Sequence, residues 1–262
     1  MSLLVVDLGN SRVKWAVHDD GPRGPSRSAA YGDWSADDWR RALFAAPGIE
    51  RVIVASVVTG RAADLLRVAA RGATGRDPEF AVTSRETAGV RNAYPEPALL
   101  GVDRWLAVIA AHHDPGGACC VVDVGTATTI DAVRGDGQHL GGFIVPGPRL
   151  MVGSLWHGTS ELATRSAASG PSVTAHFADN TRDAIERGCR LALASLVDRC
   201  VADLEVLLGT APRLLLSGGA AGEVRALLKS PCTVEPDLVL RGLLVASAGP
   251  AGGTAGIVPH SK

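Results

Sequence analysis

The chain has 262 residues, of which 46% are hydrophobic and 20% are charged, a composition typical of a soluble protein with ample apolar material for a core. The length suits one large domain or two domains of about 120 residues each. Basic residues number 26 and acidic residues 27, which gives a net charge of −1. Nucleic-acid binding is therefore not expected, because it requires a basic excess on one face.

Neither a signal peptide nor a membrane span is predicted. The N-terminus, MSLLVVDLGN, lacks basic residues, and Asp7 interrupts its apolar run. No stretch approaches the roughly 20 apolar residues that a membrane span needs. The cysteines are odd in number and no pair has CxxC spacing, so we interpret them as reduced, packed thiols of a cytoplasmic protein rather than disulfides or metal ligands. They are Cys119, Cys120, Cys189, Cys200 and Cys232.

Strands and helices are predicted to alternate along the chain, which indicates an α/β fold. In chain order we expect a strand at 3–6, a returning strand at 15–17, a helix at 35–46, a strand at 51–57, helices at 61–71 and 102–113, a strand at 118–124, a returning strand at 128–133, and helices at 180–208 and 223–229. The first helix opens on a capping box formed by Ser35 and Asp38. The helix at 180–208 is either continuous or divided at Gly188.

An internal sequence similarity indicates a duplicated domain. Residues 5–17 read VVDLGNSRVKWAV and residues 121–133 read VVDVGTATTIDAV, so Val, Val, Asp, Gly, Ala and Val recur without gaps. The period is too long for a solenoid. Each half would open with a strand, an Asp-x-Gly turn and a second strand, although two apolar hairpins can also resemble each other by chance.

The Asp-x-Gly turns carry groups suited to a triphosphate. The aspartate at the end of the strand can hold hydrated Mg²⁺, and the glycine permits a positive φ and a close approach of phosphate. Asn10 and Ser11 in the first turn, and Thr126 in the second, supply donors to phosphate oxygens. Lys14 can add a positive charge. A single such turn is most often only a hairpin, whereas two of them one domain apart indicate more.

This pair of turns resembles the actin/hexokinase/Hsp70 superfamily, in which two related domains clamp a nucleotide. Leu214-Leu-Leu-Ser-Gly-Gly219 is similar to the adenosine motif of that superfamily, and the chain contains neither a Walker A nor a GxGxxG sequence. The resemblance implies two duplicated ribonuclease H-like α/β domains, at 1–115 and 116–248, with a nucleotide cleft between them. The Gly/Pro/Ala-rich tail, 249–262, is expected to be flexible.

Further segments resemble the type III pantothenate kinases, and they follow the order of that family over nearly the whole chain. They are Tyr94-Pro95, Gly101-Val-Asp-Arg104, Asp123-Val-Gly-Thr-Ala-Thr-Thr129, Gly141-Gly-Phe-Ile-Val-Pro-Gly147, Asn180-Thr-Arg-Asp-Ala-Ile-Glu-Arg-Gly188 and Asp237-Leu-Val-Leu-Arg-Gly-Leu243. The resemblance implies transfer of the ATP γ-phosphoryl group to the primary hydroxyl of pantothenate, the first step towards coenzyme A. That reaction needs positioning, charge neutralisation and a proton acceptor.

The resemblance assigns roles to particular residues. Asp103 would be the catalytic base, although an N-cap at the start of a helix is the competing interpretation. Asp7 would hold Mg²⁺ through water. The predicted ATP-binding residues are Asp7, Leu8, Gly9, Asn10, Ser11, Arg12, Val13, Lys14 and Thr126. The predicted substrate-binding residues are Tyr94, Gly101, Val102, Asp103, Arg104 and Thr181. Otherwise, Tyr94 would be a packing ring and Arg104 an arginine exposed to solvent.

A monovalent cation and a dimer also follow from the resemblance. Asp123 would bind the K⁺ or NH₄⁺ that the family requires. Thr181 would reach the substrate site of the partner subunit in a homodimer, or it would simply start a helix capped by Asn180. Two departures stand out, since Ser11 replaces a threonine that is usual in the family, and Ala220-Ala221 follow the adenosine glycines where many members have an acidic residue.

Other functions stay open at this stage. The family also contains regulatory factors, once named Bvg accessory factors, so a non-catalytic member that binds nucleotide or pantothenate is the main alternative. A kinase or phosphatase of the same superfamily acting on a sugar, acetate or polyphosphate is another. An actin-like filament or chaperone ATPase is disfavoured, because such chains usually carry inserted subdomains that 262 residues cannot hold.

Overall fold

The computed structural model describes residues 2–19, 25–113, 117–158, 177–248 and 256–258. They form two compact units, the first comprising Met1–Pro115, Asp136–Gly141 and Asp237–Lys262, and the second Gly116–Gly135 and Gly142–Pro236. These units differ from the predicted domain boundaries in two segments, 136–141 and 237–248, which belong to the first unit. The part of the predicted tail that is described, 256–258, contains a short strand, and the rest of it lies outside the described residues.

The first unit is built on a six-stranded sheet with the order β13-β5-β4-β1-β2-β3. β1 pairs antiparallel with β2 and parallel with β4, and β2 pairs antiparallel with β3. A separate hairpin of β6 and β7 completes the strands of this unit. Their bounds are β1 Ser2–Leu8, β2 Arg12–His18, β3 Arg27–Ala30, β4 Ile49–Ser56, β5 Glu79–Ala81, β6 Glu86–Thr87, β7 Val90–Arg91 and β13 Ile257–Val258.

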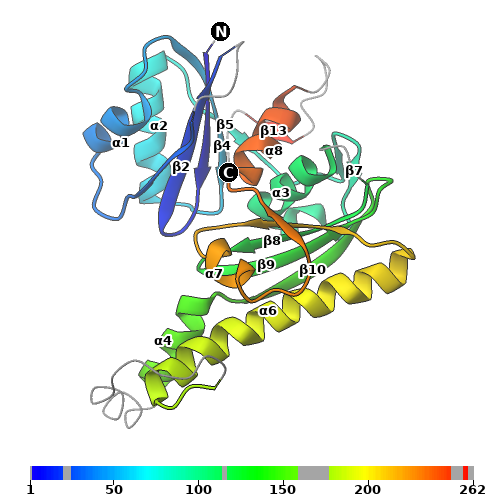
Figure 1. The fold of residues 1–262 in the computed structure, drawn as a ribbon. Helices are drawn as coiled ribbons and strands as arrows, with labels where there is room; N and C mark the ends of the chain where they lie inside the picture. The colour runs from blue at the N-terminus through cyan, green and yellow to red at the C-terminus, as the bar shows by residue number, and fades with distance from the viewer. Residues whose placement is uncertain (1, 20–24, 114–116, 159–176, 249–255, 259–262) are drawn as a thin grey trace. The chain divides into compact units, whose positions relative to one another are not determined.

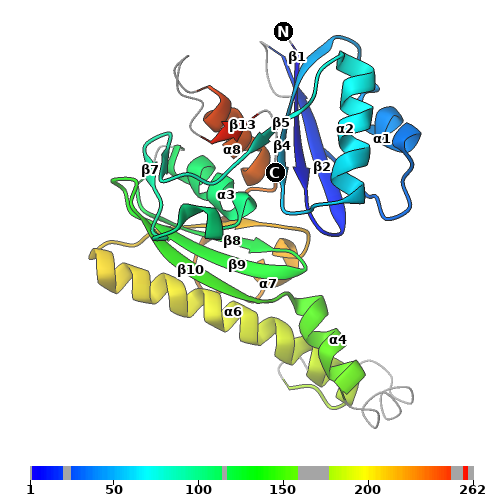
Figure 2. The ribbon, with the colours of Figure 1, turned by 180° about the vertical axis from the view of Figure 1, so that it is seen from behind.

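Helices cover both faces of this sheet, with α1 and α2 on one side and α3 and α8 on the other (Figures 1 and 2). This explains why β1 is apolar without alternation, because strands buried on both faces need no polar side. The helix α8 can approach α3 closely at Gly242, where a Cβ atom would lie 2.1 Å from the Leu106 carbonyl oxygen. The helices are α1 Ala36–Leu43, α2 Arg61–Thr74, α3 Val102–His113 and α8 Leu238–Ser247, with a short 3₁₀ helix at Pro97–Leu99.

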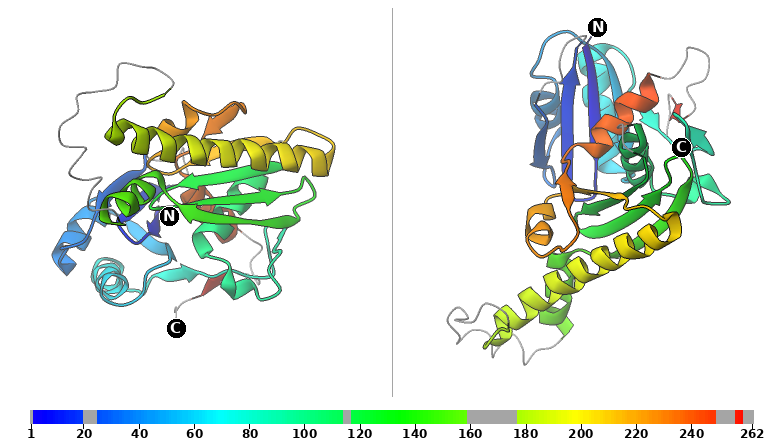
Figure 3. Two further views of the ribbon diagram at one scale, coloured as in Figure 1. Left: turned by 90° about the horizontal axis from the view of Figure 1, so that it is seen from below. Right: turned by 45° about the vertical axis from the view of Figure 1, so that its right-hand side comes forward.

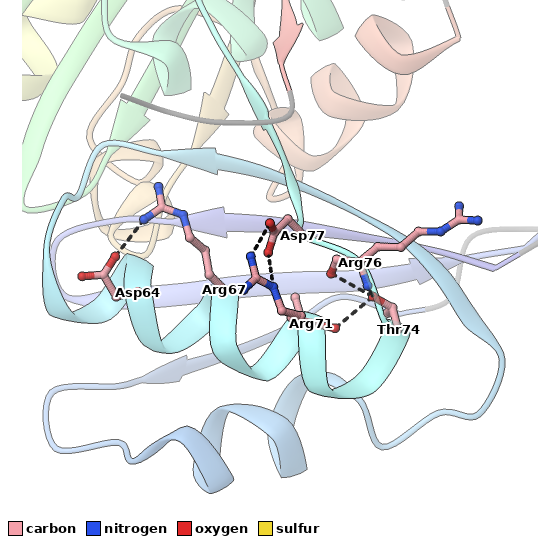
Figure 4. A network of polar contacts seen from close by, with 7 residues as sticks. Asp64, Arg67, Arg71, Thr74, Arg76 and Asp77 are labelled. Atoms are coloured by element: carbon pink, nitrogen blue, oxygen red, sulfur yellow. Dashed lines mark hydrogen bonds and ion pairs between the residues drawn. The ribbon is translucent and has the colours of Figure 1, made fainter.

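Polar contacts hold the C-terminal half of α2 to the chain that follows it (Figure 4). Arg71 donates to both carboxylate oxygens of Asp77, at 2.8 and 2.5 Å, and Arg67 pairs with Asp64 at 2.8 Å. The helix ends at Gly75 in the left-handed region, with a φ of 73°. The Arg71–Asp77 contact and Gly75 together end α2 and direct the chain into β5, whereas the Arg67–Asp64 pair lies within the helix.

The second unit repeats the same topology in a five-stranded sheet with the order β10-β9-β8-β11-β12. β8 pairs antiparallel with β9 and parallel with β11, as β1 does with β2 and β4. The long helix α6 and the short α7 cover one face through an apolar core, and α4 packs beside the N-terminal end of α6 (Figure 3). The bounds are β8 Cys119–Val124, β9 Ala127–Val133, β10 His139–Pro146, α4 Pro148–Gly158, α6 Thr181–Leu208, β11 Arg213–Ser217, α7 Ala221–Arg225 and β12 Cys232–Val234.

The repeated topology confirms the prediction of duplicated α/β domains, but the gapless alignment of the two hairpins is wrong beyond the turn. Four residues separate the paired Leu8 and Val13, whereas three separate Val124 and Thr128. Val13 therefore corresponds to Thr128 and not to Thr129. The alternation of buried and exposed residues along β2 and β9 agrees with this shift. The recurrence of Ala and Val at the ends of the two hairpins is thus coincidental.

Most of the predicted elements are present. The capping box is confirmed, because Ser35 Oγ accepts from the Asp38 backbone and the Asp38 carboxylate accepts from the Ser35 backbone. The helix at 102–113 is confirmed to the residue, and α6 runs through Gly188 without a break. The helix predicted at 223–229 corresponds to α7, which is shorter and begins two residues earlier. The strands β3, β5, β10 and β12 and the helices α4 and α8 were not predicted, because they are short or lack clear periodicity.

The cysteines agree with the expectation of packed thiols, since three are buried and two are half-buried. All five cysteines lie in the described part of the chain and are free thiols. Within the described ranges, no helix combines the length and the apolarity needed to span a bilayer.

Candidate active site

The first predicted phosphate turn connects β1 to β2. Asp7 lies one residue before the end of β1, is half-buried, and faces Lys14 across the antiparallel pair. Its neighbours Val6 and Leu8 point into the core under α1 and α2. Because side chains alternate along a strand, Asp7 and Lys14 lie on the other face of the sheet, together with α8.

Tyr31 supports this turn, although no sequence pattern predicted it. Its hydroxyl group donates to the Gly9 carbonyl oxygen at 2.6 Å and lies 3.1 Å from that of Asn10. Inside the turn, the Gly9 amide donates to the Arg12 carbonyl at 3.1 Å. Burial raises the pKa of Tyr31 and keeps the hydroxyl protonated as a donor. No sequence motif marks Tyr31, since its role depends on where β3 returns.

One of the two predicted reasons for the glycines of these turns, a positive φ, is wrong, whereas the close approach of phosphate stays a prediction. Neither Gly9 nor Gly125 has a positive φ. A Cβ atom at either position would lie 3.4 Å from a carbonyl oxygen of its own turn, which is an ordinary contact. Because glycine has no Cβ atom, these two residues leave open space beside the turn. They do not provide a left-handed backbone there.

The predicted ATP-binding segment divides into core and exposed residues. The side chains of Leu8 and Val13 are fully buried in the apolar core, so only their backbone can contact a ligand. The side chains of Asn10, Ser11 and Arg12 are exposed, and Arg12 Nε donates to Ser28 Oγ at 3.1 Å. The donors available to a phosphate thus come from the tip of the turn.

Lys14 contacts a residue from the far end of the chain. Its Nζ atom lies 3.6 Å from Asp237 Oδ1, and both side chains are about one-quarter to one-third exposed, at 27% and 31%. Asp237 immediately precedes α8. In the sequence, Asp237 stands out only as part of a family segment, because a contact over more than 200 positions has no local signal.

The second phosphate turn brings three predicted segments together within the second unit. Asp123 lies beside Ser217 in the parallel pair of β8 and β11. The next residue, Gly218, has a φ of +91°, and a Cβ atom there would lie 2.4 Å from Asp123 Oδ1. On the other side, the Gly147 amide donates to the Thr126 carbonyl at 2.9 Å. The predicted cation residue, adenosine motif and Pro-Gly segment therefore meet at one turn.

All of the predicted substrate residues except Thr181 lie in the first unit, where contacts link Tyr94, Arg104 and Asp103. Arg104 is only 6% exposed, so the interpretation as a solvent-facing arginine is wrong. Its Nη1 atom donates to the Tyr94 hydroxyl oxygen at 3.1 Å, and its guanidinium carbon lies 5.9 Å from the centre of the Tyr94 ring. Tyr94 is half-buried and its ring is nearly parallel to that of His139.

Asp103 lies at the start of α3, but it is not the N-cap residue. Val102 is the first residue of the helix, and the Gly101 carbonyl accepts the first helical hydrogen bond from Trp105 at 3.0 Å. Asp103 Oδ1 accepts from the Arg104 backbone N–H at 2.8 Å. A Cβ atom at Gly101 would lie 2.6 Å from that oxygen, so glycine there leaves room for the carboxylate. A carboxylate in this place gains from the helix dipole.

Thr181 is the first residue of α6, and Asn180 caps the helix by accepting from the Asp183 backbone at 2.9 Å. The helix-start interpretation is therefore confirmed for Asn180, and it leaves the half-buried Thr181 available for a second role. His157 lies on α4, with its Nδ1 atom 2.8 Å from the Gly153 carbonyl oxygen.

The role of Tyr31 can be tested by Tyr31→Phe, which removes the donor and keeps the ring. We expect the KM for ATP to rise about 5- to 10-fold, because one neutral hydrogen bond contributes about 1 kcal/mol to holding the turn. The KM for the acceptor substrate should not change, and neither should kcat. Steady-state kinetics in both substrates measure this, and an unchanged KM for ATP would contradict the supporting role.

Comparison with solved structures identifies the fold. The chain matches a putative Baf family transcriptional activator from Campylobacter jejuni with a TM-score of 0.53 and 20% identity, over 92% of this chain and 95% of the other. It also matches component A of the (R)-2-hydroxyglutaryl-CoA dehydratase of Acidaminococcus fermentans, with a TM-score of 0.50 and 17% identity over 93% and 95%. The fold is that of the actin-like ATPases.

Sequence comparison identifies the family within this class. The profile of the type III pantothenate kinases matches residues 3–203. A type III pantothenate kinase of Aromatoleum aromaticum is 39% identical over 93% of this chain and 96% of its own length. The chain belongs to the type III pantothenate kinase family.

Proposed function

We propose that this protein transfers the γ-phosphoryl group of ATP to the primary hydroxyl group of pantothenate, giving 4′-phosphopantothenate, the first step towards coenzyme A. The family match over residues 3–203 carries the proposal. The local geometry supports it at the start of α3, where the Asp103 carboxylate adjoins the buried Arg104. The free cysteines favour a reducing compartment, and we include the cytoplasm in the proposal on that ground.

In this reaction Asp103 acts as the general base. The hydroxyl oxygen of the acceptor attacks the γ-phosphorus, the bond to the β-phosphate oxygen breaks, ADP leaves, and the hydroxyl proton passes to the Asp103 carboxylate. Arg104 and Tyr94 hold each other through a hydrogen bond and a stacking contact and so can orient the acceptor. Gly101 and Val102 offer backbone groups beside the same carboxylate.

ATP and a divalent metal belong to the kinase family, and the residues of this chain fit both. Asp7 supplies a carboxylate suited to Mg²⁺ with its water shell, and the exposed tip of the first turn supplies donors to phosphate. In the part of the chain that is described, no three His, Cys, Asp or Glu side chains gather into a metal site. That is compatible with a metal held mainly by water and phosphate. When bound, Mg²⁺ would neutralise charge on the transferred group.

The direct test measures phosphopantothenate after incubation of the purified protein with Mg-ATP and pantothenate. Formation of the product would establish the activity. Binding of ATP without any product would favour the regulatory alternative, a family member that acts through a partner. Phosphorylation of a sugar or acetate in place of pantothenate would favour another kinase of the same superfamily.

The domain boundaries 1–115 and 116–248 remain part of the proposal as the extent of the two duplicated domains.

We expect the reaction to require K⁺ or NH₄⁺, with Asp123 as the protein ligand. The Asp123 carboxylate is packed against Gly218, and hard oxygen donors of this kind suit an alkali cation. Asp123→Asn should lower kcat about 100-fold and weaken the activation by K⁺, because charge near the γ-phosphate is lost. The measurement is product formation against K⁺ concentration with Na⁺ as the ionic-strength control. Full activity without K⁺ or NH₄⁺ would contradict this part of the proposal.

We also expect a homodimer. Apolar side chains are exposed on neighbouring elements of the second unit, with Phe143 and Ile144 on the edge strand β10 at 58% and 62% exposure. Leu150 on α4 and Leu191 on α6 are exposed as well. Exposed apolar side chains on neighbouring elements favour an interface there, and a second copy would bring Thr181 to a neighbouring substrate site as the family resemblance implies.

Light scattering after size exclusion tests the dimer. The double variant Phe143→Asp/Ile144→Asp should elute as a monomer with less than about a tenth of the activity, because each buried charge would be unpaired in the interface. Val206→Asp, at the exposed C-terminal end of α6, is the matched control and should stay dimeric. A monomeric native protein with full activity would contradict both the dimer and the role of Thr181.

A further inference from the structure

His139 is a fully buried side chain that none of the assigned roles uses. It is the first residue of β10 and has 0% exposure. Histidine side chains are seldom buried completely, so the full burial of His139 calls for a physical explanation. Its ring lies at 11° to the ring of Tyr94, with 6.4 Å between the two ring centres. This is an offset parallel arrangement within the range at which aromatic rings attract each other.

His139 is the last member of a chain of contacts that leads to Asp103. The Tyr94 ring, stacked on His139, also meets the Arg104 guanidinium, whose Nη1 donates to the Tyr94 hydroxyl at 3.1 Å. The Arg104 backbone in turn donates to Asp103 Oδ1 at 2.8 Å. The Tyr94 backbone is held by its own hydrogen bonds, since its amide donates to Asn92 Oδ1 and its carbonyl accepts from Arg85, each at 2.9 Å. The contacts with His139 and Arg104 act on the ring itself.

The segment that carries His139 is itself fixed to the first unit. The Gly137 carbonyl accepts from the Arg91 amide at 2.9 Å, and a Cβ atom at Gly137 would lie 2.0 Å from the Gly89 carbonyl oxygen. The Gln138 side chain donates to the His139 carbonyl at 2.8 Å. The backbone of His139 is therefore held in place independently of Tyr94, as a supporting residue requires.

We propose that His139 is a positioning residue for the pantothenate side of the active site, where its flat ring fixes the orientation of Tyr94 and, through Tyr94, of Arg104. The proposal rests on the function proposed above, in which Tyr94 and Arg104 contact the acceptor. A displaced Tyr94 would weaken the binding of the acceptor, because its hydrogen bond to Arg104 would be disturbed. The ATP turn has its own support from Tyr31, so it should be unaffected. His139 itself does not touch the reacting atoms.

Three variants separate a positioning role from a general structural role. His139→Phe keeps a flat ring, His139→Leu removes it at similar volume, and His113→Leu changes an exposed histidine at the end of α3 as a control. We expect His139→Leu to raise the KM for pantothenate between about 10- and 100-fold, with the KM for ATP unchanged. His139→Phe should restore most of the affinity. Thermal unfolding of each variant reports folding separately.

A spectroscopic readout tests the same contact without activity. The chain has two tyrosines, so incorporation of 3-fluorotyrosine gives two ¹⁹F resonances, and Tyr94→Phe assigns them. His139→Leu should shift or broaden the Tyr94 resonance and leave that of Tyr31 in place, whereas His139→Phe should move it less. Pantothenate should shift the Tyr94 resonance in the native protein, and a failure of that shift alone would count against the proposed substrate site. An unmoved Tyr94 resonance in folded His139→Leu, or an equal rise of both KM values, would overturn the role of His139.

Discussion

Asp103→Asn is expected to lower kcat by about 10²- to 10⁴-fold, the usual contribution of a positioned general base. Asparagine has the same shape and its side-chain oxygen can still accept the Arg104 N–H that Asp103 accepts at 2.8 Å. The first turn of α3 should therefore remain intact, and the KM values for ATP and pantothenate should change little. The measurement is direct quantification of phosphopantothenate under saturating substrates, with thermal unfolding run in parallel.

Asp64→Asn provides the matched control for this variant. Asp64 also lies in the first turn of a helix, α2, where its carboxylate pairs with Arg67 on the exposed surface. It carries no predicted role in the reaction, so its loss should leave kcat unchanged. If Asp103→Asn retained full activity, Asp103 would be only a favourable charge at a helix N-terminus, and another group would have to accept the proton.

Gly218→Ala is expected to destabilise the protein by about 2–5 kcal/mol, because it combines a strained backbone with overpacking. Gly218 has a φ of +91°, which side-chain-bearing residues rarely adopt. Its new Cβ atom would also lie 2.4 Å from Asp123 Oδ1 and 2.5 Å from the Val124 carbonyl group. Urea denaturation measures the loss, and any folded fraction should respond weakly to K⁺ since the Asp123 carboxylate must move.

The neighbouring glycine makes a close control. Gly219 has no positive φ, and a Cβ atom there would meet nothing within 4 Å. Gly219→Ala should therefore change the free energy of unfolding by no more than about 0.5 kcal/mol. Equal stabilities of Gly218→Ala and Gly219→Ala would refute the packing of Gly218 against the second phosphate turn.

An ungapped alignment of the two duplicated hairpins matches the wrong residues in their second strands. Their first strands align as predicted, with Asp7 opposite Lys14 and Asp123 opposite Thr129. The turn of the first hairpin is one residue longer, so Lys14 corresponds to Thr129, and the second turn has no lysine at this position. The two turns are therefore chemically unequal. This agrees with a proposal that assigns Mg²⁺ and most phosphate contacts to the first turn, and a monovalent cation together with the Thr126 phosphate contact to the second.

The residues of the candidate site were largely predictable, but their environments were not. Asp103, Arg104 and Tyr94 were identified from their motifs, yet the burial of Arg104 and its bond to Tyr94 depend on how the loop before α3 folds back. Tyr31 and His139 have no motif of their own. Tyr31 contacts Gly9 across more than 20 positions, and His139 contacts Tyr94 across more than 40. Such contacts leave no periodic pattern in a single sequence.

By itself, the sequence determined the features that depend on local interactions. The apolar strands β1, β4 and β8, the capped start of α1, the bounds of α3 and the Asn180 cap of α6 all follow from side-chain periodicity and from hydrogen bonds within four residues. The two Asp-x-Gly turns are local in the same sense, and with the ordered motifs they were enough to indicate the family.

Only the tertiary structure decided which distant segments meet. It paired β13 with β5, placed α8 against α3 at Gly242, and brought Asp237 to Lys14 and His139 to Tyr94. It also showed that Gly218, rather than Gly9 or Gly125, requires a left-handed backbone. These outcomes depend on burial and close packing between elements far apart in the chain, where the favourable contact exists only after the whole sheet has formed.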